Sequence, residues 1–167
     1  MQGHGVPCQM RRKEKGERRK KVGTWRAMSA EKEENERIMK HKLEVQIRFN
    51  DIDILGHLNN TVYYSLYDLG KARYMEDIGL RPRGPVAPTC VIADVHCTYF
   101  FPIHYGDEIY VTTECREVGE KHFTLEQELV DGEGQVRSHC TTVMVYIDPA
   151  TGKSAPLPEN YKQALER

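Results

Sequence analysis

A single stretch of helical periodicity, residues 60–78, lies among segments whose side chains alternate as they do in strands. Apolar and small residues recur along it at every third or fourth position, and they are Tyr63, Leu66, Tyr67, Gly70, Tyr74 and Ile78. Gly79 follows, and a glycine commonly ends a helix at such a position. Because one helix cannot bury its own apolar stripe, the other elements must cover it.

The segments around this helix favour strands. LEVQIRF, residues 43–49, alternates apolar and polar side chains and predicts a half-buried strand. After the helix, β-branched and aromatic residues predict four more strands, at 89–101, 108–118, 122–130 and 135–148, and a short terminal helix at 156–167. The order of one strand, one long helix and four strands predicts an α+β fold, with an antiparallel sheet wrapped around the helix.

The beginning of the chain differs from the rest in charge. Residues 1–26 carry nine basic and two acidic side chains, a net +7, so the remainder carries −8 of the total of −1. Without apolar periodicity, residues 1–40 are predicted to be a disordered basic extension, with a possible short helix at 29–40, ahead of a domain at 41–167. The extension is either a tether to nucleic acid or membrane or an addition of little consequence.

Composition narrows the class of protein. An acidic domain is not typical of nucleic-acid binders, and no apolar run is long enough to span a bilayer, so neither partner is expected. Five cysteines without a C-x-x-C pair argue against a disulfide framework. With no apolar leader visible, these features predict a cytoplasmic protein.

Residues 51–60 crowd polar side chains between the first strand and the helix. Asp51 and Asp53 resemble the start of a calcium loop, but Leu55 and Val62 occupy positions that need ligands. His57 has no second His or Cys at a spacing typical of zinc sites. The sequence therefore predicts no metal site.

A carboxylate just before a helix is the chemistry that remains. Asp53 precedes Asn59 and Asn60, where the helix is expected to begin. A helix N-terminus presents free N–H groups and partial positive charge, which can stabilise an oxyanion. The carboxylate can deprotonate water or attack a carbonyl itself. Together they make an acyl-transfer site for a substrate that is already activated, as a thioester is.

Three motifs carry a resemblance to a known family. They are D-I-D-I-L-G-H-L-N-N-T-V-Y-Y (51–64) with Arg73 in the helix, Y-F-F-P-I-H-Y-G-D (99–107) and G-K-S-A-P-L-P (152–158). In this order they resemble the hotdog-fold acyl-CoA thioesterases, in particular the 4-hydroxybenzoyl-CoA thioesterase-like branch. The resemblance covers about residues 42 to 165.

The resemblance implies a hotdog fold, with a five-stranded antiparallel sheet around one central helix. It implies hydrolysis of an acyl-CoA thioester without a cofactor, in a homodimer or homotetramer with active sites at the subunit interface. The family's catalytic carboxylate falls on Asp53, as nucleophile or general base, and its oxyanion N–H falls on Asn60. The alternative function is a non-catalytic hotdog module that binds acyl-CoA or acyl-carrier protein.

The other residues of the loop receive supporting roles. His57 is expected to orient or contact the substrate, and Tyr64 is a candidate for the substrate pocket, although an aromatic stripe often serves the core. Asp51 is expected to hold the loop through its side chain, and Gly56 to permit a tight backbone. Asn59 or Asn60 is expected to cap the helix.

Overall fold

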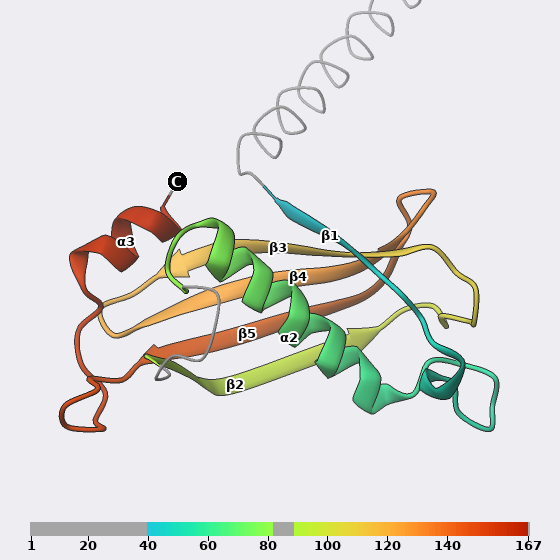
Figure 1. Cartoon of the computed structure of the whole chain (residues 1–167), viewed down its shortest axis with the longest axis horizontal. Helices are drawn as coiled ribbons and strands as arrows, with labels where there is room; N and C mark the ends of the chain where they lie inside the picture. The colour runs from blue at the N-terminus through green and yellow to red at the C-terminus, as the bar shows by residue number, and fades with distance from the viewer. Residues whose placement is uncertain (1–39, 82–88, 167) are drawn as a thin grey trace, which may run out of the picture. The chain divides into compact units, whose positions relative to one another are not determined.

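The computed structural model describes residues 40–81 and 89–166. These residues form one five-stranded sheet in the order β1-β3-β4-β5-β2, in which all neighbouring strands are antiparallel (Figure 1). The elements are β1 (His41–Val45), η1 (Phe49–Asp51), α2 (Asn60–Asp77), β2 (Cys90–Tyr99), β3 (Ile109–Val118), β4 (His122–Asp131), β5 (Val136–Tyr146) and α3 (Glu159–Leu165). The α+β prediction, a sheet packed on one long helix, is confirmed.

Helix α2 crosses one face of this sheet (Figure 1), and its buried side is the predicted stripe. Tyr63, Leu66, Tyr67 and Tyr74 are all less than a tenth exposed. Gly70 lies against the sheet, because a Cβ atom there would overlap the side chain of Val111 on β3. Glycine in the middle of a helix is intrinsically unfavourable, and close packing on the sheet explains why this one is present.

The centre of the sheet also buries polar groups, each with a partner. Gln127 on β4 is 1% exposed, and its Nε2 donates to the Tyr67 carbonyl at 2.9 Å and to Thr113 Oγ1 at 3.0 Å. The Tyr67 hydroxyl and Ser138 Oγ lie 2.6 Å apart. These bonds tie the middle of α2 to strands β3, β4 and β5. Losing one of them would leave a buried polar group without a partner, which is costly.

The ends of two elements differ most from the sequence prediction, while the other predicted ends lie within two residues of those observed. The first strand spans His41–Val45 and not 43–49, because the chain turns into η1 at Phe49–Asp51 before the alternation ends. The terminal helix spans Glu159–Leu165 and not 156–167, because Pro158 adopts an extended conformation at the N-cap. Residues 1–39, and with them the basic extension and nearly all of the helix expected at 29–40, lie outside the described residues.

Candidate active site

The loop before α2 is held by its own polar groups. The Asp51 carboxylate accepts the Arg48 N–H at 2.8 Å, and the Asp51 carbonyl accepts the Asn59 N–H at 2.8 Å. Asp53 donates its N–H to the His57 carbonyl at 2.8 Å, and Gly56 completes the turn at a φ of +79°. The expected structural roles of Asp51 and Gly56 are therefore confirmed, and the loop fixes the backbone of Asp53.

Helix α2 begins with an asparagine cap. Asn59 has an extended backbone, and its side-chain oxygen accepts the Thr61 N–H at 3.0 Å. The Val62 N–H donates to the Asn59 carbonyl at 2.9 Å. Among the described residues, no acceptor takes up the N–H of Asn60, the first residue of the helix. This N–H is therefore free to bind an incoming oxygen, at the positive end of the helix.

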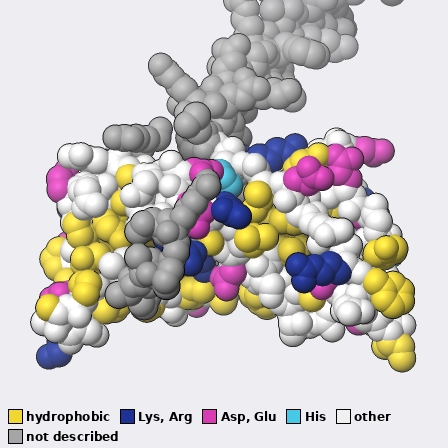
Figure 2. Space-filling model, viewed as in Figure 1, with side chains coloured by type: hydrophobic (Ala, Val, Ile, Leu, Met, Phe, Trp, Pro, Cys, Tyr) yellow, Lys and Arg dark blue, Asp and Glu magenta, His cyan; other side chains and the backbone are white. Residues whose placement is uncertain are grey.

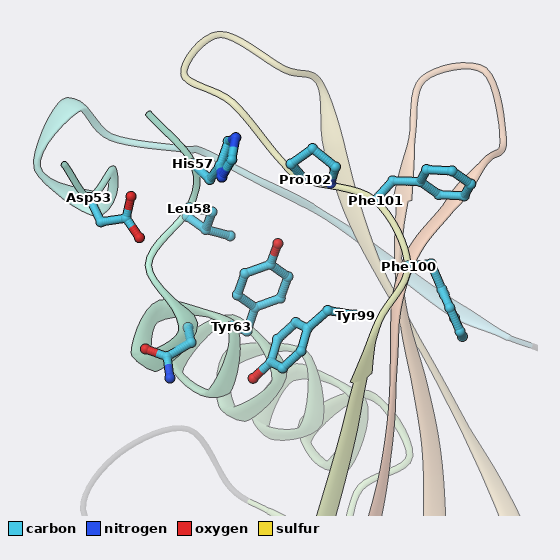
Figure 3. A pocket seen from close by; sticks show the side chains of 9 residues that line it. Asp53, His57, Leu58, Tyr63, Tyr99, Phe100, Phe101 and Pro102 are labelled. Carbon is cyan, nitrogen blue, oxygen red and sulfur yellow. The ribbon is translucent and has the colours of Figure 1, made fainter. Parts of the chain in front are cut away.

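A pocket of about 290 Å³ opens at this end of the helix. Nine residues line it: Asp53, His57, Leu58, Asn60, Tyr63, Tyr99, Phe100, Phe101 and Pro102. In Figure 3, Asp53 lies on one side, Phe101 and Pro102 lie on the other, and Leu58 and Tyr63 lie between them. The pocket thus combines one carboxylate, one imidazole and one helix terminus with a mainly aromatic wall.

The Asp53 carboxylate is half-buried and partly engaged. One of its oxygens accepts the Leu55 N–H at 2.8 Å, which orients the group within its own turn. Within the described part of the chain, its other oxygen has no hydrogen-bond or ion-pair partner. That oxygen can act on a bound water or on a carbonyl.

His57 lies at the pocket mouth, opposite a histidine from another loop. Its ring centroid is 5.3 Å from that of His104, and the rings meet edge to face at 76°. The Leu58 N–H donates to the Ile103 carbonyl at 2.8 Å, so the two loops are joined directly beside both rings. The loop that carries His57 therefore packs against a second loop, which contains Ile103 and His104.

The aromatic wall comes from the end of β2 and is supported by Arg137. The Arg137 carbonyl accepts the N–H groups of Phe100 and Phe101 at 2.9 and 3.1 Å, and its guanidinium donates to the Pro102 carbonyl at 3.1 Å. The same guanidinium pairs with Asp131, and its Nε and Nη2 both lie 2.9 Å from the same carboxylate oxygen, Oδ2. Backbone N–H donation, foremost from Gln135, together with Arg137, lowers the pKa of Asp131 and keeps it ionised.

The two pocket tyrosines are neutral phenols near neutral pH. Desolvation by burial is the main cause that raises the pKa of Tyr63. Desolvation also raises the pKa of Tyr99, with further contributions from hydrogen bonds to Cys97 and Tyr64. Their rings meet edge to face at a centroid distance of 4.8 Å. Both hydroxyls can donate a hydrogen bond, but neither can serve as a base.

The structure brings together three of the four predicted site residues. Asp53, His57 and Asn60 line one pocket, whereas Tyr64 is 40% exposed and lies outside its lining. Sequence reasoning assigned no role to the wall at residues 99–102, although the motif at 99–107 was a signal that could have led to it. In the described ranges, no three His, Cys, Asp or Glu side chains are grouped closely enough to hold a metal ion.

Comparison with known proteins gives the family. A family model described as "Thioesterase-like superfamily" matches residues 47–165, which include the loop, the helix and the whole aromatic wall. The chain belongs to this superfamily. The match also covers every residue that lines the pocket, so the family resemblance and the geometry concern the same part of the molecule.

Solved structures of other proteins share the fold of this chain. The chain is similar to a thioesterase from Thermus thermophilus, crystallised with coenzyme A and Zn, with 30% identity and a TM-score of 0.66 over 75% of this chain and 91% of that one. It shares the fold of the SAV2348 protein of Staphylococcus aureus, solved in complex with CoA, with 21% identity and a TM-score of 0.70 over 77% of this chain and 83% of that one. The hotdog fold is therefore confirmed.

A curated relative is also found. The uncharacterized protein YsmA of Bacillus subtilis strain 168 is 23% identical over 122 residues, which are 73% of this chain and 82% of that protein.

No helix in the described ranges has the length and hydropathy required to cross a membrane.

Proposed function

We propose that this thioesterase-superfamily protein hydrolyses an acyl-CoA thioester to a free acid and CoA. The observation that carries the proposal is the meeting of Asp53 and the α2 N-terminus in one pocket. Residues 41–167 would be the catalytic domain, and residues 1–40 an extension to it. The cytoplasmic location expected from the cysteines remains a prediction.

In the proposed reaction, the thioester carbonyl lies between Asp53 and the start of α2. The Asn60 N–H would donate to the carbonyl oxygen, and this bond strengthens as negative charge develops on that oxygen. The free oxygen of Asp53 would either deprotonate the attacking water or attack the carbonyl to form an anhydride that water then cleaves. In both routes the C–S bond breaks, the thiolate of CoA leaves and takes up a proton, and the acyl group departs as the acid.

The remaining pocket residues would bind the substrate. An apolar acyl group would fit against the wall at 99–102 and the neighbouring ring of Tyr63, and its burial there would stabilise the complex. His57 at the mouth would contact the thioester end of the substrate. Tyr64, exposed and beside Tyr99, stays a predicted substrate contact that would need a second subunit or a bound ligand to cover it.

We further propose that two copies of the chain pair through β2, which is one of the two edge strands of the described sheet. Val91, Ile92 and Val95 on this strand are all more than two-fifths exposed. An apolar strand with an unpaired edge is a ready template for pairing with another chain. Because the wall at 99–102 continues β2, such a pair would bring the second copy beside the pocket, as the family resemblance implies for a dimer or a dimer of dimers.

Apolar side chains also gather at the right-hand end of the molecule in Figure 2, where Figure 1 has η1 and the loop before α2. Phe49, Ile54, Leu55 and Tyr105 are all exposed there, and the rings of Phe49 and Tyr105 meet at 6.0 Å. This second exposed surface lies close to the pocket loop and is a further candidate for burial in an oligomer.

The experiment is thiol release from a panel of acyl-CoAs that varies chain length and aromaticity. Wild type is expected to hydrolyse at least one member, and Asp53→Asn to lose about 100-fold or more of that rate. Equal rates for the two proteins would contradict the role of Asp53. Tight binding of acyl-CoA without turnover by the wild type would favour the alternative, a non-catalytic hotdog module.

A further inference from the structure

His57 has little to hold its ring. It is exposed on a loop, and among the described residues neither of its ring nitrogens takes part in a hydrogen bond or an ion pair. Its ring packs edge to face against His104, at 5.3 Å between ring centroids. An exposed side chain without other contacts samples several rotamers, so this ring contact limits where the imidazole points.

The backbone of His104, by contrast, is held by a turn of its own. Its backbone N–H donates to Asp107 Oδ2 at 2.9 Å, and the Asp107 N–H donates back to the His104 carbonyl at 3.3 Å. The same carboxylate oxygen lies 3.7 Å from the ring Nδ1 of His104. Gly106 gives the turn its left-handed residue, at a φ of +90°. Asp107 therefore holds the backbone of His104 and lies close to its ring.

The two histidine loops are also coupled through the backbone. The Leu58 N–H binds the Ile103 carbonyl at 2.8 Å, which joins the residue after His57 to the residue before His104. The His57 carbonyl in turn accepts the Asp53 N–H at 2.8 Å. The two loops are thus joined twice, once through the backbone and once through the imidazole rings. The backbone of His57 is bonded in turn to that of Asp53.

We propose that His104 is a positioning residue, which holds the His57 imidazole over the pocket mouth through their edge-to-face contact. His104 does not line the pocket, so it acts through His57 and not on the substrate. Its contribution is to preorganise a group that would otherwise have to be ordered when the substrate binds. The kinetic part of this inference rests on the proposed hydrolysis; the orientation of the ring does not.

A double-mutant cycle tests the kinetic part. His104→Ala is expected to lower kcat/KM by about tenfold in the wild-type background and by less than about twofold in His57→Ala, because the ring that it positions is then gone. His104→Phe keeps a flat ring without nitrogens and is expected to stay within about threefold of wild type. An equal loss from His104→Ala in both backgrounds would overturn the inference, as would a His104→Phe variant as impaired as His104→Ala.

Imidazole NMR signals test the orientation without any turnover. The His57 ring signals are assigned as those that disappear in His57→Ala, and they are expected to shift and average in His104→Ala. Tyr105→Ala is the matched control, because this neighbouring ring packs on Phe49 and not on His57. Unchanged His57 signals in His104→Ala would refute the positioning role even if hydrolysis stands, whereas shifted signals would support it even if no substrate is found.

Discussion

Strands β4 and β2 are both long and apolar, yet the chain buries them very differently. Along β4 the side chains alternate between buried and half-buried, and Phe123, Leu125 and Leu129 are wholly buried. Along β2 most side chains are exposed, including Val95 at 41%. The difference follows from position, because β4 lies between β3 and β5 beneath α2, while β2 pairs with β5 alone in the described sheet.

This contrast separates stability from function. The centre of the sheet and the inner face of α2 supply the burial that holds the fold, and Gln127 there bonds to the Tyr67 carbonyl and to Thr113. The β2 edge contributes less to that core, and its continuation at 99–102 forms the wall of the pocket. The exposed apolar side chains of β2 thus remain available, as proposed above, to a second copy, while those of the wall at 99–102 line the pocket.

The largest expected effect is on the free energy of unfolding when a buried side chain of β4 is truncated. Leu129→Ala should lower it by about 3 kcal/mol, since a cavity forms where there is no solvent. Val95→Ala on β2 is the matched change and should cost less than about 1 kcal/mol at protein concentrations that keep the chain monomeric. Urea unfolding measures both free energies. Equal losses for the two variants at every protein concentration would contradict the difference between β4 and β2.

A second change probes the close contact between Gly70 on α2 and the sheet. Gly70→Ala should lower the free energy of unfolding by about 2 kcal/mol, because the added methyl overlaps Val111 and outweighs the gain in helix propensity. Ser65→Ala, at an exposed position of the same helix, should leave stability within about 0.5 kcal/mol of wild type. A stabilised Gly70→Ala protein would mean that the helix has room for a methyl group between Gly70 and Val111.

A third change tests the β2 edge as an interface. Val95→Lys should weaken self-association at least tenfold, about 1.4 kcal/mol, because pairing would bury an unmatched charge. Glu117→Lys changes an exposed residue near the end of β3, which is separated from β2 by β4 and β5, and should leave association unaltered. Sedimentation at several concentrations gives the association constants. A wild-type chain that stays monomeric and active would remove the proposed dimer.

The smallest expected effect is at the cap of α2. Asn59→Ala should cost about 1 kcal/mol, because the Thr61 N–H loses its acceptor, while Asn59→Asp should cost little since it keeps one. Thermal unfolding measures the difference. If the alanine and aspartate variants were equally stable, the side chain of Asn59 would not be the cap.

The sequence predicted the elements that depend on local pattern. The stripe at Tyr63, Leu66 and Tyr67 follows helical spacing, and the structure buries it against the sheet as expected. Asp53, His57 and Asn60 were predicted together because they lie within eight residues, so that one loop and one helix terminus bring them to a single pocket.

Contacts between distant segments were beyond this reasoning. The pairing of His57 with His104 and the support of the 99–102 wall by Arg137 depend on how two loops and a hairpin meet in space. The early end of β1 escaped prediction for a different reason, because the local bond between the Arg48 N–H and the Asp51 carboxylate at η1 overrides an alternating pattern that continues to Phe49.

The central claim is that Asp53 performs the chemistry while its neighbour Asp51 only holds the loop. The most direct measurement is kcat with the best acyl-CoA for Asp53→Asn and Asp51→Ala, alongside thermal unfolding of the same samples. Asp53→Asn should lose about 100-fold or more of kcat while its melting temperature stays near that of wild type. Asp51→Ala should lose melting temperature and keep kcat within about tenfold of wild type at temperatures well below its transition. The reverse pattern, with turnover preserved in Asp53→Asn and abolished in a folded Asp51→Ala, would contradict the account.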